Sequence, residues 1–145
     1  MLKKLSLLIL SVIMILTILP TQTLASNHGD TNYSFTLTTN SSVTTKERAK
    51  NNTTSTYVRL DSVPGSAVLI SVEGFRPTGS GGTNVWMNET VGGTQVAKPG
   101  QWLVRQNVYE RGGRSARLRF QRYSTSGTVN GAWSPDSVGT YPRLN

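Results

Sequence analysis

The chain has no cysteine and a single histidine, His28, among its 145 residues. A chain without cysteine forms no disulfide and no thiolate metal site, and structural zinc needs several Cys or His ligands together. A serine nucleophile needs a positioned base, and His28 lies close to the predicted start of the mature chain, where packing cannot hold it. We therefore expect no metal, no cofactor and no catalytic triad.

Acidic residues are also few: there are 7 Asp and Glu against 15 Lys and Arg, which gives a formal net charge of +8. Hydrolysis by paired carboxylates needs two acids that converge on one bond, whereas the acids here are scattered, mostly beside turns or loops. They are Asp30, Glu47, Asp61, Glu73, Glu89, Glu110 and Asp136. We expect a protein that is not an enzyme, with a hydrolase as the last alternative.

The beginning of the chain has the order of a secretory signal peptide: a charged start, an apolar run and a polar stretch. Two lysines precede the apolar run Leu5–Leu19, and Thr23-Leu24-Ala25 places small residues three and one before a cut after Ala25. Spanning a bilayer takes about 20 apolar residues, more than this run offers. We predict a cleaved leader over residues 1–25 and a secreted, extracellular domain over residues 26–145.

We expect the mature protein to be released and soluble rather than tethered, because it has no cysteine for a lipid and its end, Tyr141–Asn145, is short and polar. It also stays basic once the leader is removed. A released basic protein is attracted to anionic surfaces, so the partners we expect are an anionic cell-wall polymer or a membrane surface. No motif for specific nucleic-acid recognition accompanies the arginines.

Several segments have the alternation or the β-branched composition of strands, and turn signals separate them at intervals of about 8 to 12 residues. They are Tyr33–Thr38, Tyr57–Leu60, Ala67–Val72, Val85–Met87, Trp102–Glu110, Ser115–Tyr123 and Thr128–Trp133. Residues 39–56 read as a long loop, and the Pro64-Gly65 turn predicts a hairpin between the second and third strands. This pattern predicts an all-β fold: a single antiparallel, Greek-key-like β-sandwich of about seven strands, with a small open barrel as the alternative.

Arginines gather in the predicted hairpin formed by the fifth and sixth of these strands. They are Arg105, Arg111, Arg114, Arg117, Arg119 and Arg122, with Glu110 as the acid among them. A three-residue loop, Arg111–Gly113, makes the two apolar faces coincide and sets Val104 opposite Phe120. In that register Arg105 lies directly opposite Arg119 on the outer face, Asn107 lies opposite Arg117, and Tyr109 lies opposite Ser115.

Like charges opposite each other destabilise a hairpin, so an unpaired Arg105 and Arg119 would favour an anionic partner. The sequence therefore predicts anion binding by Arg105, Arg117 and Arg119. The alternative is a solvated face whose arginines protect a long strand from edge pairing. Trp86 and Tyr109 are the candidates for an exposed aromatic contact, whereas Trp102 and Trp133 alternate with apolar residues and are predicted to lie in the core.

The leader, Asn32-Tyr33-Ser34-Phe35, and Gly131-Ala132-Trp133-Ser134-Pro135-Asp136-Ser137 near the end together resemble a known group of proteins. They are similar to small secreted proteins of Gram-positive bacteria that are catalogued as a domain of unknown function. That resemblance implies no catalytic or binding residues. In size, charge and cysteine-free composition the chain also resembles the lactococcin 972-type bacteriocins. Our first hypothesis is binding of an anionic envelope component, and the alternative is a bacteriocin-like antimicrobial protein.

Overall fold

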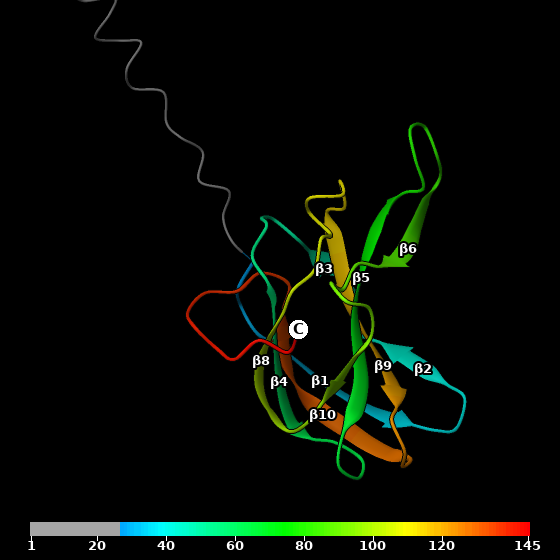
Figure 1. Ribbon diagram of the computed structural model, residues 1–145, viewed down its shortest axis with the longest axis vertical. Helices are drawn as coiled ribbons and strands as arrows, with labels where there is room; N and C mark the ends of the chain where they lie inside the picture. The colour runs from blue at the N-terminus through cyan, green and yellow to red at the C-terminus, as the bar shows by residue number, and fades with distance from the viewer. Residues whose placement is uncertain (1–26) are drawn as a thin grey trace, which may run out of the picture.

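The computed structural model describes residues 27–145, so the predicted leader, residues 1–25, lies outside the described residues. In this range the chain is all-β, as the sequence predicts, with antiparallel strands in two facing sheets (Figure 1). The strands are β1 (Thr31–Leu37), β2 (Ser42–Thr44), β3 (Arg48–Ala49), β4 (Thr56–Ser62), β5 (Val68–Pro77), β6 (Asn84–Asn88), β7 (Gln95–Ala97), β8 (Gly100–Val104), β9 (Ser115–Arg122) and β10 (Gly127–Ser134). Among the described residues, no helix is long and apolar enough to cross a membrane.

The first sheet has the order β1-β10-β4-β8, and the second has the order β2-β9-β5-β6, with β3 also paired to β9 and β7 to β5. In Figure 1 the strands β8, β4 and β10 lie on one side of the body and β9, β5 and β6 on the other. The loop between β5 and β6 projects from one end. The two sheets bury one face each against the other, which is how two amphipathic sheets form a sandwich.

The core lies between the sheets and follows the period-two alternation of the strands. In β5, Val68, Ile70 and Val72 have no exposed surface, and in β9 the same holds for Leu118 and Phe120. The prediction that Ala67–Val72 is a central strand is confirmed, because β5 pairs with β9 on one side and with β6 and β7 on the other. Of the two tryptophans predicted to be in the core, Trp133 is buried in it and Trp102 is partly buried and packs against the core.

The Pro64-Gly65 turn does not form the predicted hairpin. It leads from β4 in the first sheet to β5 in the second, so these consecutive strands do not pair. Both edges of β4 are taken by β10 and β8, and both edges of β5 by β9 and by β6 with β7. The tight turn therefore joins the two layers of the sandwich instead of two neighbours in one layer.

The predicted arginine-rich hairpin is wrong as well. Its first strand ends at Val104 as β8, which pairs with β4, while its second strand is β9 in the other sheet. Beyond Val104 the chain forms a turn over residues 108–112, and the side chains before and at its start remain inside: Gln106 is 4% exposed and Val108 has no exposed surface. The Gln106 side chain accepts a hydrogen bond from the Val108 amide at 2.7 Å, and the Gly113 amide donates to the Val108 carbonyl at 2.8 Å.

The predicted long loop, residues 39–56, contains two short strands, β2 and β3, which both pair with β9. Thr45 lies between them and holds the segment to β9: its amide donates to the Leu118 carbonyl and its hydroxyl accepts from the Leu118 amide, each at 3.0 Å. Together with β7 these are the strands that the sequence did not predict. Each is two or three residues long, which is too short for an alternation to be recognised.

Candidate functional site

The outer face of the second sheet carries three of the five side chains that the sequence singles out: Trp86, Arg117 and Arg119. Because side chains alternate along a strand, the buried Leu118 and Phe120 leave Arg117 and Arg119 on the outer side of β9. On β5 the same rule places Glu73 and Phe75 outward, and their cross-strand neighbours are Arg117 and Trp86 respectively. We call Glu73, Phe75, Trp86, Arg117 and Arg119 the arginine–aromatic face.

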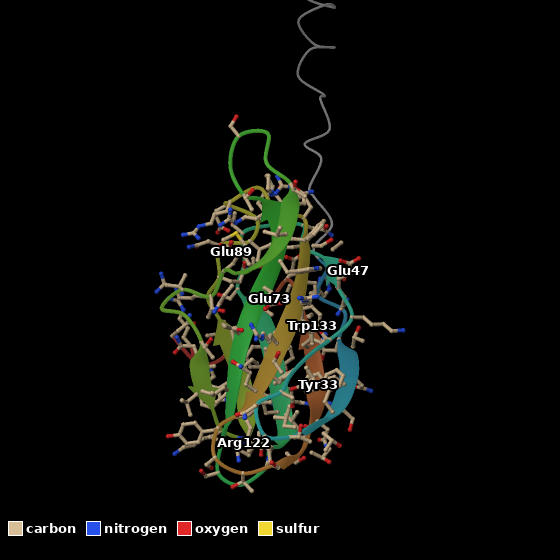
Figure 2. All side chains as sticks on the ribbon, turned by 90° about the vertical axis from the view of Figure 1, so that its right-hand side faces the viewer. Tyr33, Glu47, Glu73, Glu89, Arg122 and Trp133 are labelled. Carbon is tan, nitrogen blue, oxygen red and sulfur yellow. The ribbon has the colours of Figure 1, made fainter. Side chains whose placement is uncertain are left out.

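Glu73 lies at the centre of this face and binds both arginines. Its Oε2 atom accepts a hydrogen bond from Nε of Arg117 at 2.7 Å and lies 2.7 Å from Nη2 of the same guanidinium, and its Oε1 atom lies 3.4 Å from Nη1 of Arg119. The carboxylate is only 7% exposed, so the arginines provide the hydrogen bonds that a buried charge requires. Figure 2 shows Glu73 in front of the neighbouring strands β5 and β9.

The two arginines differ in how fully the protein uses their donors. Arg117 is fixed by two bonds to Glu73 and by the Trp86 ring, whose centroid lies 4.1 Å from the guanidinium carbon. Arg119 makes one long contact with Glu73 and its side chain is 38% exposed, although its Nε atom is buried and has no hydrogen-bond partner among the described residues. One carboxylate serves two guanidinium groups, so one positive charge on this face is uncompensated.

Trp86 and Phe75 form the apolar part of the face. Their ring centroids are 5.3 Å apart with the planes tilted by 40°, and Phe75 is 36% exposed. Neighbouring Val85 and Met87 of β6 are also exposed. The face thus combines aromatic surface with a guanidinium that has free donors, a combination that suits a ligand with both flat apolar groups and negative charge.

The other two predicted site residues lie elsewhere, because the hairpin that would have gathered them does not form. Arg105 is exposed just beyond β8, where its backbone amide donates to the Asn145 side chain at 2.8 Å. Tyr109 lies in the turn that precedes β9 and is covered by Arg114, whose guanidinium carbon is 3.9 Å from the ring centroid. The predicted pairing of Arg105 with Arg119, and the anion site that it implied, are therefore wrong in geometry.

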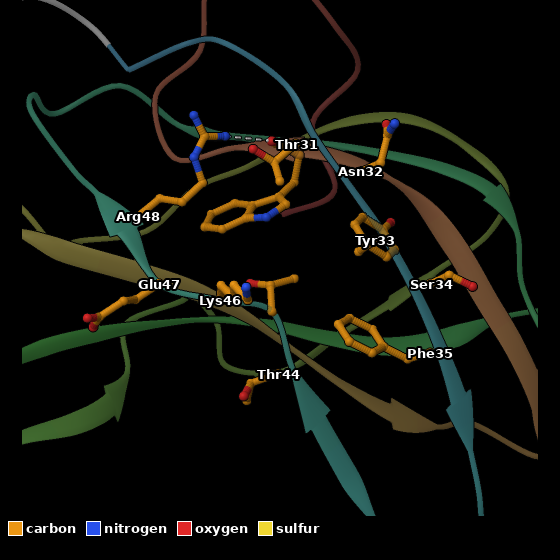
Figure 3. Close-up of a pocket in the computed structure, with 11 residues that line it drawn as sticks. Thr31, Asn32, Tyr33, Ser34, Phe35, Thr44, Lys46, Glu47 and Arg48 are labelled. Atoms are coloured by element: carbon orange, nitrogen blue, oxygen red, sulfur yellow. Dashed lines mark hydrogen bonds between the residues drawn. The ribbon is translucent and has the colours of Figure 1, made fainter.

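A cleft of about 570 Å³ on the open side of the sandwich was not predicted at all. It lies between β1, an edge strand of the first sheet, and the segment that joins β2 to β3 (Figure 3). Tyr33 and Phe35 of β1 stack with ring centroids 6.1 Å apart and form one wall, and Trp133 contributes a third ring. The alternation of hydroxyl and aromatic residues in Asn32–Phe35 was the signal that could have indicated an aromatic wall.

Arg48 and Lys46 are the cations that line this cleft, and both Nη atoms of Arg48 are already hydrogen-bonded. Nη1 donates to the Trp133 carbonyl at 3.0 Å and Nη2 to the Asn27 side chain at 2.7 Å, while the guanidinium lies over the Trp133 ring. Burial lowers the pKa of Arg48, although a guanidinium stays charged under ordinary conditions. Arg48 therefore supports the aromatic wall, and the cleft offers a ligand mainly apolar surface.

The described residues offer few side-chain groups that could bind a metal or take part in catalysis. Across residues 27–145, no group of three or more His, Asp or Glu side chains is placed to hold a metal ion. Glu89, a second carboxylate that serves two arginines, has no exposed side-chain surface and is bonded to Arg76 and Arg111. Its role in the structure is to compensate these charges at the end of the second sheet.

Comparison with known proteins gives one match. A family model described as a protein of unknown function, DUF2712, matches residues 21–137, which confirms the resemblance to proteins of unknown function. No curated protein matches the chain. No solved structure matches it either. The resemblance to the lactococcin 972-type bacteriocins stays a prediction.

Proposed function

We propose that this chain, which belongs to the DUF2712 family, is an extracellular binding protein whose arginine–aromatic face holds an anionic polymer of the cell envelope. The observation that supports this most is the state of Arg119. Its side chain is 38% exposed, and its contact with Glu73 is long, at 3.4 Å. A phosphate or carboxylate of the ligand would bind this guanidinium from its exposed side.

The aromatic pair gives the proposed ligand its second property. Sugar rings have an apolar face that packs on aromatic side chains, and Trp86 and Phe75 offer such a surface on the same face of the sheet, next to Arg117. Arg117 keeps Trp86 in place because its guanidinium is fixed by Glu73 on one side and covers the ring on the other. The basic balance of the whole chain, 15 Lys and Arg against 7 Asp and Glu, adds long-range attraction to a polyanion.

The test is binding of the purified protein to a poly(glycerol phosphate) wall polymer that carries sugar substituents, to anionic lipid vesicles and to a neutral glucan, across a range of salt concentrations. Losing one charged hydrogen-bonding group costs about 1.5–3 kcal/mol, so Arg119→Ala should weaken binding of the preferred anion by about tenfold or more. Trp86→Ala should weaken binding of the polymer but not of the vesicles, since only the polymer has groups that stack.

The matched control is Arg105→Ala, which removes the same charge from an exposed position off the face. If binding follows net charge alone, Arg105→Ala and Arg119→Ala will reduce the affinity equally, and the proposal for this face is then wrong. Affinity that does not change with salt would contradict an electrostatic contribution.

A further inference from the structure

A fully buried ion pair lies away from the proposed binding face. Lys50 follows β3 of the second sheet and Asp136 follows β10 of the first, and neither side chain has any exposed surface. The Nζ atom of Lys50 lies 2.8 Å from Oδ1 of Asp136. An ion pair removed from water in this way carries a large desolvation cost, which makes its neutral form comparatively favourable.

The surroundings of the lysine nitrogen direct its three hydrogens. Nζ donates to the carbonyl oxygens of Thr54 and Pro135, the latter at 2.6 Å, and to Oδ1 of Asp136. If the third proton moves to Oδ1, the two remaining hydrogens stay on the two carbonyls. The lone pair that is left then lies where the third N–H pointed, toward the Asp136 carboxyl group.

The second carboxyl oxygen has a different environment. Oδ2 of Asp136 accepts hydrogen bonds from two backbone amides, that of Asn27 at 2.8 Å and that of Asn51 at 3.1 Å. Two backbone N–H groups that converge on one oxygen are the arrangement that stabilises the negative charge of a tetrahedral intermediate in acyl transfer. Burial also lowers the pKa of Lys50, against the opposing effect of Asp136, which favours a neutral, nucleophilic amine.

We propose that Lys50 and Asp136 join in an intramolecular amide bond. The Nζ lone pair attacks Cγ of Asp136, the N–Cγ bond forms, and the charge that develops on Oδ2 is held by the two backbone amides. The Cγ–Oδ1 bond then breaks, and Oδ1 leaves as water with two protons, both taken from the lysine nitrogen. An ammonium and a carboxylate thus become one amide and one water molecule, with no oxidant and no other reactant.

The third lysine hydrogen remains as the amide N–H and keeps one of the two carbonyl partners. Within residues 27–145 no second carboxylate hydrogen-bonds to either side chain, so both proton transfers run within the pair. We therefore expect the bond to form over hours to days. The product ties the segment after β3 to the segment after β10 and so links the two sheets covalently. In a chain without cysteine it would take the place of a disulfide.

The experiment is intact mass spectrometry of the purified protein, compared with the mass calculated from its sequence and its measured N-terminus. After incubation of the folded protein at neutral pH for several days, we expect a mass lower by one water molecule. Proteolytic digestion should then yield one branched peptide that contains both Lys50 and Asp136. A folded protein that retains the full calculated mass would overturn the proposal.

Variants separate this reaction from other losses of water. Lys50→Arg keeps the positive charge but cannot form the amide, so it should have its full calculated mass. A water loss that persists in Lys50→Arg would come from a cyclised aspartate elsewhere and would count against the proposal. Lys46→Arg, at an exposed lysine, should lose water as the wild type does. If Lys50→Arg fails to fold, the peptide map of the wild type decides alone.

Discussion

Glu73 shows how a single residue determines the character of the binding face. It lies on the outer side of its strand. It is nevertheless nearly buried, because Arg117 and Arg119 cover it and bind both of its oxygens. Without this carboxylate the two arginines would repel each other across the face. The same carboxylate limits how strongly they attract a ligand, since it already compensates one of their two charges.

Replacing Glu73 by glutamine should therefore have two opposite effects. We expect Glu73→Gln to lower the free energy of unfolding by about 1–3 kcal/mol, because two arginines lose a buried partner. It should also tighten binding of poly(glycerol phosphate). Chemical denaturation and a binding titration check the two effects. Asp61→Asn, which breaks the exposed pair with Arg59, should leave the stability nearly unchanged. Lower stability with unchanged binding would show that the ligand does not meet these arginines.

Gly131 is a residue whose lack of a side chain is required by a neighbouring backbone. A Cβ atom built there would lie 1.9 Å from the Arg59 carbonyl oxygen and 2.8 Å from the Tyr33 hydroxyl, beside the irregularity in the β10–β4 pairing. No side-chain rotation relieves a clash with backbone, so β10 and β4 must separate locally.

We expect Gly131→Ala to lower the free energy of unfolding by roughly 2–4 kcal/mol, near the upper end for single substitutions. Urea denaturation measures this directly. The matched control is Gly29→Ala, where a Cβ would meet nothing within 4 Å, and its stability should equal that of the wild type. Equal stability of both variants would mean that β10 adapts at no cost.

At the scale of the strands, what could be predicted was local. The alternation in Tyr33–Thr38 and the β-branched run Ala67–Val72 were sufficient to locate β1 and β5, because side-chain periodicity is a property of the strand itself. Which strands pair is decided by the faces that meet across the whole sandwich. Glu73 and Arg117 illustrate the difference: they are direct neighbours in space but 44 residues apart in the chain.

The error at Arg105 has the same origin. A glycine-rich turn between two amphipathic segments predicts a hairpin, and nothing nearby in the sequence indicates that the first strand ends at Val104 or that the two strands belong to different sheets. Trp86, Arg117 and Arg119 were found because each lies on the exposed side of an alternating strand. Lys50 was missed because a lysine in a polar stretch is normally solvated.

The short strands β2 and β3 depend on Thr45, which gives a test at this scale. Thr45→Val preserves shape but removes the acceptor of the buried Leu118 amide, so we expect a loss of about 1–3 kcal/mol of stability. Hydrogen exchange at Leu118 should become faster while exchange in β10 changes less. Thr36→Val, at an exposed position of β1, should leave both measurements unchanged. Unaltered exchange at Leu118 would show that β2 and β3 are held to β9 by other contacts.

For the whole molecule, the buried tyrosine of the cleft predicts how stability depends on alkaline pH. Burial, and next the charge of Asp61, raise the pKa of Tyr33, and its hydroxyl donates to the Arg59 carbonyl at 2.8 Å. In the unfolded chain a tyrosine ionises near pH 10. Above that pH the unfolded state loses the proton more readily than the folded state, so the stability that Tyr33 contributes is present below about pH 10 and declines above it.

Denaturation at a series of pH values should therefore show stability falling above about pH 10 in the wild type and less steeply in Tyr33→Phe. At neutral pH the variant should be less stable by about 1 kcal/mol, because the hydrogen bond to Arg59 is lost. Tyr123→Phe, at a tyrosine that is 52% exposed, should keep the slope of the wild type. A slope that is the same in Tyr33→Phe and the wild type would contradict this origin.

The order of the strands also determines when the molecule can fold. Every connection except those from β2 to β3, β5 to β6 and β6 to β7 crosses from one sheet to the other, so partner strands are seldom close in sequence. Such non-local topologies fold in about milliseconds to seconds, far more slowly than helical bundles. β1 pairs only with β10, from Thr31 opposite Trp133 to Leu37 opposite Gly127. During synthesis, which proceeds at roughly 5–20 residues per second, the first strand has no partner until the last one has been made.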